Sequence, residues 1–191
     1  MGWKNVKVHY GITHYVMVAD KGICIGSGYV HDLLVVRNSD EPRDWRDSVD
    51  RTETKIGCNL SLWRPRHLGQ GEPFDGIVKA MMDDPATLRR LIETPDTFSA
   101  SVPVYTYDYD GNIIDKLCEE PGWPNVTHDG DMMYENTFST DRDQVIKWAQ
   151  RNMEAGRENA ALDIEQQEEE LARTRERLSR FEAALVKLRA A

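Results

Sequence analysis

Alternating hydrophobic and polar positions predict short strands in the first part of the chain. The alternation over 6–12 has a period of two, which is typical of a half-buried strand. Two further apolar runs, 15–19 and 23–25, are separated by Asp20-Lys21-Gly22, a sequence that suits a tight hairpin turn. Four consecutive apolar residues at 33–36 indicate a buried strand. The N-terminal segment therefore predicts a small sheet.

The centre of the chain predicts a mixture of loops, strands and helices. Residues 38–51 are densely charged, which indicates an exposed loop or a short surface helix, and 55–63 return to strand-like character. Prolines and glycines over 65–73 mark a loop. A helical pattern follows at 77–82. Asp84-Pro85 then supplies a cap and a first-turn proline for another helix, which Pro95 ends and whose shared apolar face is made by Leu88, Leu91 and Ile92.

Two Asp-Gly turns predict hairpins in the next segment. Residues 102–107 and 112–117 flank Asp108-Tyr109-Asp110-Gly111, the clearest hairpin signal in the chain. Residues 126–127 and 132–138 flank Asp129-Gly130, and we expect this second hairpin to extend the same sheet. Three tyrosines at a period of two share one strand face, which is either a core face or an exposed interaction patch, and we favour the core face: Tyr105, Tyr107 and Tyr109.

The C-terminal segment 139–191 predicts one long helix. It contains no proline and one glycine, and Thr140 with Asp143 forms a plausible capping box at its start. Fifty helical residues reach about 75 Å, too far to lie on the preceding body. The predicted fold class is therefore α+β: a small antiparallel β-sheet body with hairpins and one or two short helices over 1–138, followed by a long C-terminal helix of the coiled-coil or helical-hairpin type.

An apolar stripe follows one face of this predicted helix. Four of its residues lie seven positions apart and two more lie three positions after the last pair, as in a coiled-coil seam: Ile164, Leu171, Leu178 and Leu185, with Phe181 and Leu188. Arg157, Gln167 and Thr174 interrupt it. Three interpretations follow: the stripe folds back onto its own body, pairs with a second copy, or docks on a different protein.

The charges beside the stripe are compatible with helix pairing. In a parallel homodimer Glu170 would face Arg175 and Arg177 would face Glu182, which are attractive pairs, whereas Asp163 would face Glu168 and repel it. Within one helix, Glu169–Arg173 and Glu176–Arg180 are favourable i,i+4 pairs worth roughly 0.2–0.5 kcal/mol each. The sequence leaves the helix orientation open.

Composition narrows the class of protein. The 191 residues are 40% hydrophobic, enough for a core, and carry 24 Lys and Arg against 33 Asp and Glu, a net charge of −9. Excess acid disfavours unspecific binding to nucleic acid and to anionic membranes. Three widely spaced cysteines, with no signal-peptide pattern and no transmembrane-length apolar run, predict a soluble cytoplasmic protein.

The negative charge belongs to the middle of the chain. Residues 38–138 hold ten bases and twenty acids, a net charge of −10. Residues 1–37 carry +2 and residues 139–191 carry −1. The sequence thus predicts an acidic body attached to a nearly neutral helix.

Acidic turns are the candidates for chemistry. Asp108 and Asp110 resemble part of a calcium loop, but the first and twelfth ligand positions fall on threonine and leucine, so a hairpin turn is the favoured interpretation. His128, Asp129 and Asp131 would make a metal-dependent hydrolytic site if the turns met in space. We expect these residues to form an acidic turn surface, with no catalytic, metal or cofactor residue assigned. The lone Cys58 is predicted to be a buried small apolar residue.

The last third of the chain resembles one broad group of proteins. The segment Asn125-Val126-Thr127-His128-Asp129-Gly130, followed by Met133-Tyr134-Glu135-Asn136-Thr137-Phe138 and a charged helix, is similar to uncharacterised small accessory proteins of tailed bacteriophages and prophages. This resemblance implies expression in a bacterial cytoplasm and an accessory role, in a class that includes proteins that bind and block host defence complexes. It carries over no catalytic residue.

These observations favour a non-enzymatic protein-binding factor over two alternatives. The helix would form a homodimer, and the acidic body would dock on a basic surface of another protein, a nucleoprotein complex being one candidate. One alternative is a metal-dependent hydrolase or nuclease that uses His128, Asp129 and Asp131. The other is a structural or virion-associated component, for which the long helix is the supporting feature.

Overall fold

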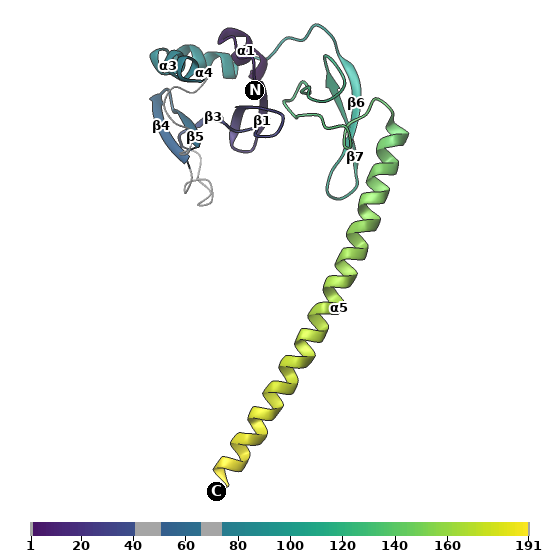
Figure 1. The fold of residues 1–191 in the computed structure, drawn as a ribbon. Helices are drawn as coiled ribbons and strands as arrows, with labels where there is room; N and C mark the ends of the chain where they lie inside the picture. Colours follow the sequence, from purple (N-terminus) through teal and green to yellow (C-terminus); the bar gives the residue numbers. More distant parts are fainter. Residues whose placement is uncertain (1, 41–50, 66–73, 191) are drawn as a thin grey trace.

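The computed structural model describes residues 2–40, 51–65 and 74–190, which form two antiparallel sheets, short helices and one long helix (Figure 1). In chain order the elements are α1 (Trp3–His9), β1 (Tyr15–Ala19), β2 (Gly22–Gly26), β3 (Leu34–Asn38), β4 (Arg51–Gly57), β5 (Leu60–Pro65), α3 (Asp75–Asp83), α4 (Pro85–Glu93), β6 (Val102–Tyr107), β7 (Ile113–Cys118) and α5 (Arg142–Arg189). The α+β prediction and its long C-terminal helix are confirmed.

The larger sheet has five strands in the order β1-β2-β3-β5-β4, and every neighbouring pair is antiparallel. The predicted turn at Asp20-Lys21 joins β1 to β2, with Ala19 opposite Gly22. The glycine has φ +120°, and a Cβ there would lie 2.3 Å from the carbonyl oxygen of Val36 on β3. The turn thus needs glycine both for its backbone angle and for the close approach of the next strand.

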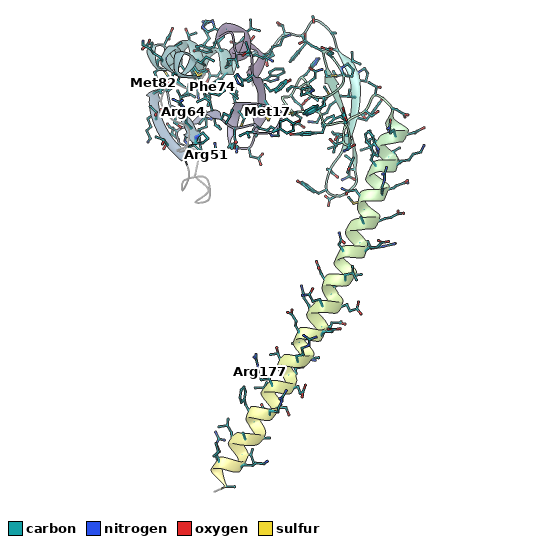
Figure 2. The ribbon with its side chains drawn as sticks, in the orientation of Figure 1. Met17, Arg51, Arg64, Phe74, Met82 and Arg177 are labelled. Atoms are coloured by element: carbon teal, nitrogen blue, oxygen red, sulfur yellow. The ribbon has the colours of Figure 1, made fainter. Side chains whose placement is uncertain are left out.

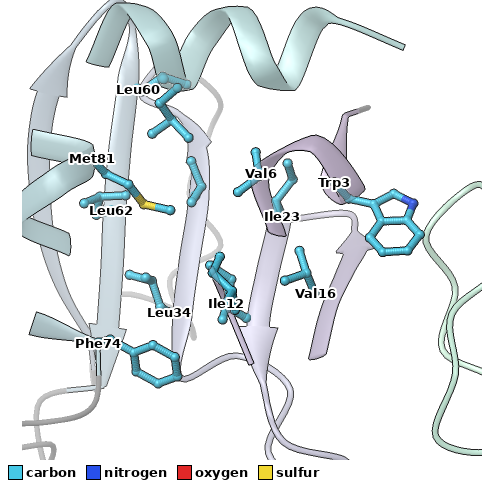
Figure 3. Packing of buried hydrophobic residues seen from close by; sticks show 13 residues of the cluster. Trp3, Val6, Ile12, Val16, Ile23, Leu34, Leu60, Leu62, Phe74 and Met81 are labelled. Carbon is cyan, nitrogen blue, oxygen red and sulfur yellow. The ribbon is translucent and has the colours of Figure 1, made fainter. Parts of the chain in front are cut away.

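Helices cover one face of this sheet. Alternate residues of β1, β2, β3 and β5 point toward α1, α3 and α4, and together they make the main core (Figure 3). Its fully buried members include Val16, Ile23, Ile25, Leu34, Leu62, Phe74, Met81 and Leu88. The predicted apolar face of α4 contributes Leu88, Leu91 and Ile92 to this core.

The opposite face of the sheet carries a second, smaller core. A row of directly paired residues crosses four strands, and Met132 from the second half of the chain packs on it; the row consists of Met17, Cys24, Val35 and Trp63. The guanidinium of Arg37 lies 4.4 Å from the centre of the Trp63 ring, a cation–π contact. This face therefore joins the N-terminal sheet to the segment after β7.

The β6–β7 hairpin forms the second sheet, as predicted from its Asp-Gly turn. The segment 126–133 lies between the two sheets: Val18 on β1 donates its N–H to the Gly130 carbonyl at 2.9 Å, and His128 donates its N–H to the Leu117 carbonyl at 2.8 Å. Trp3 on α1 donates from Nε1 to the His128 carbonyl at 3.0 Å. The turn 127–131 is thus a joint that touches both sheets and the first helix.

Helix α5 begins on the second sheet and then leaves the body (Figure 1). Val145 and Ala149 are buried, and Met153, one further turn along the same face, approaches Gly111 at the tip of the hairpin. Every residue from 154 to 189 is exposed. With 48 residues the helix is about 72 Å long, and roughly the last 54 Å project from the body.

The predicted strand over 6–12 is wrong, because residues 6–9 belong to the helix α1. Trp3 and Val6 lie one turn apart on its buried face, while Val8 is 71% exposed. The carboxylate of Asp96 accepts the N–H groups of Lys4 and Asn5 at 3.0 and 2.8 Å. A distant acid therefore stabilises the start of the helix, and no local pattern could show it.

The segment 55–63 is a hairpin rather than one strand. It divides into β4 and β5 at Cys58-Asn59, where both residues adopt left-handed φ angles of 51° and 56°. The prediction of a buried Cys58 is also wrong, because this turn exposes the thiol. The predicted loop or surface helix over 38–51 and the loop over 65–73 fall largely on 41–50 and 66–73, outside the described residues.

Three predictions about the second half need correction. The second Asp-Gly turn exists, but its flanks make only isolated bridges: Val126 with Met132 and Cys118 with Thr127. The expected tyrosine core face is wrong, since Val104 and Thr106 on the other face are buried and Tyr109 is fully exposed. Asp141, not Thr140, caps α5 by accepting the N–H groups of Asp143 and Gln144.

The joint gives a stability test at Gly130. Its φ of +101° is unfavourable for other residues, and a Cβ would lie 2.4 Å from Cγ2 of Val18. We expect Gly130→Ala to lower the free energy of unfolding by about 1–3 kcal/mol in chemical denaturation. Gly76→Ala in α3, where a Cβ meets nothing within 4 Å, is the control and should raise stability by about 0.5–1 kcal/mol. Equal effects of the two changes would contradict this role of Gly130.

Candidate functional site

The predicted acidic turn surface is divided between two separate turns. Asp108 and Asp110 lie at the tip of the β6–β7 hairpin, whereas Asp129 and Asp131 bind Lys116 on β7. Lys116 is three residues along the strand from Ile113 at the tip, a distance of about 10 Å. The structure therefore does not bring the four carboxylates together.

The ammonium of Lys116 lies between Asp129 and Asp131. It binds Oδ2 of Asp129 at 2.5 Å and also Oδ2 of Asp131, while the Thr127 hydroxyl donates to the other oxygen of Asp129. Burial opposes ionisation of Asp129, but these hydrogen bonds hold its pKa below the usual range. Burial likewise opposes the charge on Lys116, and the two carboxylates raise its pKa above the usual range. The three side chains form a compact ion-pair cluster.

His128 takes part in packing on the other side of the same turn. Its ring stacks on Phe98 with centroids 3.7 Å apart and an angle of 6° between the ring planes. Its Nε2 donates a hydrogen bond to the carbonyl oxygen of Ala100 at 3.0 Å. These contacts attach the turn to the segment that precedes β6.

Asp108 stabilises its own hairpin. Its carboxylate accepts the N–H groups of Asp110 and Asn112 at 3.0 and 2.8 Å, and the side-chain amide of Asn112 at 2.9 Å. The hydrogen bonds from Asn112 keep the pKa of Asp108 low. Within the described residues, no group of three His, Cys, Asp or Glu side chains is placed to hold a metal ion. The favoured interpretation as a hairpin turn fits this geometry.

A groove beside α1 is a site that the sequence analysis missed. It has a volume of about 450 Å³ and lies between α1 and the segment 119–126. Lys7 lines it with its ammonium 5.9 Å from the centre of the Tyr15 ring, and burial lowers the pKa of this lysine. The strand predicted over 6–12 gives no indication of this groove, because only helical geometry places Lys4 and Lys7 on the same side.

Glu119 closes one edge of this groove. Its Oε2 binds the ammonium of Lys4 at 2.7 Å, and its Oε1 accepts the N–H and hydroxyl of Ser99 at 2.6 and 2.7 Å. These hydrogen bonds, led by that from Lys4, lower the pKa of Glu119 to about 2. The carboxylate therefore joins the first helix to the second half of the chain.

The apolar stripe of α5 has no packing partner among the described residues. All six predicted packing residues are between 49% and 75% exposed: Ile164, Leu171, Leu178, Phe181, Leu185 and Leu188. The predicted ion pairs Glu169–Arg173 and Glu176–Arg180 are present at 3.1 and 3.2 Å. In the described part of the chain, the stripe does not fold back onto the body (Figure 1). It is therefore the candidate functional surface.

Glu119 provides a pH-dependent test of the α1 contact. Because its folded pKa of about 2 lies below the ordinary 4.5, its stabilisation is present above pH 4.5 and is lost as the pH falls toward 2. We expect Glu119→Gln to lower the free energy of unfolding at pH 7 by about 1–2 kcal/mol and to flatten its decline between pH 5 and 2. Glu120→Gln, at the exposed neighbouring position, should keep the original decline. Equal profiles for both variants would contradict the assignment.

No helix among the described residues is both long enough and apolar enough to cross a membrane. The chain matches no protein-family model, no curated protein and no solved structure.

Proposed function

We propose that this chain is a non-enzymatic, homodimeric protein-binding factor. The observation that carries the proposal is the stripe on α5, which presents large apolar side chains at heptad spacing along the exposed segment 154–189, where no other described element lies beside the helix. Burying one such side chain stabilises an association by about 1.5–3 kcal/mol. A second helix with the same repeat would cover the whole stripe.

The ion pairs within α5 support this use of the stripe. Arg173 and Arg180 bind glutamates one turn earlier, on the side of the helix away from the apolar residues. Four charges that flank the stripe form no ion pair among the described residues: Glu168, Glu170, Arg175 and Arg177. These positions correspond to those that select partner and orientation in coiled coils.

The second part of the proposal concerns the acidic body. Residues 74–140 contain thirteen acids and four bases, so this part alone carries a net charge of −9. Several exposed acids here have no ion-pair partner among the described residues: Asp110, Asp115, Glu120 and Glu135. Such a surface fits a basic surface on another protein, and two copies would increase avidity. By occupying the basic channel of a nucleoprotein complex, the protein would act as an accessory inhibitor. Its place of expression in this proposal is a bacterial cytoplasm.

Replacement of stripe residues tests dimer formation. We expect the full chain to have the mass of a dimer by light scattering, and the double change Leu171→Gln with Leu178→Gln to shift it to a monomer. Leu162→Gln with Val186→Gln is the matched control, because both residues are exposed apolar positions of α5 outside the stripe. A monomeric unmodified chain would overturn the proposal, and a series of increasing masses would support the structural-component alternative.

Charge reversal tests docking through the body. The tagged full chain should capture basic proteins from a bacterial lysate at about 0.05 M salt and release them at about 0.5 M, where charges are screened beyond a few ångström. Asp110→Lys with Asp115→Lys should reduce capture several-fold. Glu158→Lys with Glu165→Lys changes the net charge equally, but on α5, and should leave capture unchanged. Capture that is independent of salt or of the hairpin charges would contradict this part of the proposal.

A further inference from the structure

We infer that α5 pairs antiparallel with a second copy, in one register that places Leu171 of each chain opposite Thr174 of the other. This inference rests on the proposed dimer and specifies its geometry. Its two-fold axis passes between Leu171 and Thr174, near the middle of the exposed segment 154–189. The pairing therefore covers nearly the whole projecting part of the helix.

The distribution of apolar residues along the stripe supports this register. Each polar interruption then meets a leucine of the other copy: Gln167 meets Leu178, and Thr174 meets Leu171. Ile164 meets Phe181, and the small Ala160 meets Leu185. In a parallel pair Gln167 and Thr174 would each meet themselves, which gives two layers without a large apolar side chain. The antiparallel register leaves no such layer from 160 to 185.

The flanking charges select the same arrangement. In this register Glu168 faces Arg175, Glu170 faces Arg177 and Glu154 faces Arg189, and symmetry repeats each pair. The remaining flanking acids, Asp163 and Glu182, face alanines. All charged contacts are thus attractive, whereas the parallel arrangement sets Asp163 against Glu168.

Shifting the antiparallel pair by one heptad reverses this balance. A shift in one direction places Glu168 and Glu170 against their own copies. A shift in the other direction does the same for Arg175 and Arg177. Like charges at these positions oppose pairing, so the charge pattern favours one register.

The contact of α5 with its own body continues directly into this proposed interface. Met153 lies on the stripe and packs near Gly111 of the hairpin tip, and the next stripe position, Arg157, is exposed. In the inferred register Leu188 of the second copy lies level with Arg157. The second helix would thus continue where the hairpin ends. Farther along α5, Arg177 projects with no other element beside it (Figure 2).

Engineered cysteines distinguish the arrangements. In the full chain carrying Cys58→Ser, which removes the exposed native thiol, Ala160→Cys and Leu185→Cys are made separately, and one variant carries a tag that changes its mass. Mild oxidation of the mixture should give a disulfide between the two variants. Each variant alone should give none, because residue 160 of one copy lies about 37 Å from residue 160 of the other.

The outcomes separate the inference from the proposed function. Self-linking of Ala160→Cys or Leu185→Cys would show parallel pairing and overturn the inference while the dimer stands. A dimer by light scattering that yields no disulfide in the mixture would also overturn it, since another surface must then pair the copies. A monomer would overturn the proposed dimer itself. Circular dichroism of each variant should match the unmodified chain, because both positions are exposed on α5.

Discussion

The docking of one turn, 127–131, is the constraint on which the arrangement of the molecule depends. Val18 binds the turn from the first sheet, Lys116 from the second, and Trp3 from the first helix. The Thr127 side chain is fully buried, and its hydroxyl bonds back onto the turn that it begins. Because α5 starts on the second sheet, this joint also fixes the direction in which the helix leaves the body.

The same joint engages the side chains of the turn 127–131 that the sequence marked as candidates for chemistry. Asp129 and Asp131 bind the ammonium of Lys116, and His128 stacks on the ring of Phe98. Each of these contacts helps to dock the turn. A carboxylate paired in this way presents less negative potential to solvent, so it attracts a basic partner less strongly. Four exposed acids remain on the β6–β7 hairpin and its adjoining loops, and they are the ones to which the proposed electrostatic contact is assigned: Asp110, Asp115, Glu120 and Glu135.

The sequence predicts those parts of the fold whose cause is local. The Asp20–Gly22 turn, the Asp84-Pro85 helix start and the length of α5 each depend on residues within a few positions of one another. Helix α1 does not, since its start is stabilised by Asp96 about ninety residues later, and its alternating pattern imitates a strand. The partners of the candidate site residues could not be predicted either, because Lys116 on β7 contacts Asp129 and Asp131, which lie 13 and 15 residues later in the chain.

The polar interruptions of the α5 stripe have a physical consequence for specificity. A stripe of uniform leucines would pair in several registers with similar energies, because every layer would be equivalent. Gln167 and Thr174 remove that equivalence. They destabilise the helix pair least when a leucine of the other copy covers them, which happens only at defined offsets. The acidic residues Glu168 and Glu170 precede the basic Arg175 and Arg177, and this polarity reinforces the same antiparallel offset. A seam with fewer apolar residues can therefore specify the orientation of its helices more strictly. In the inferred arrangement it would hold the two acidic bodies at opposite ends of one helix pair.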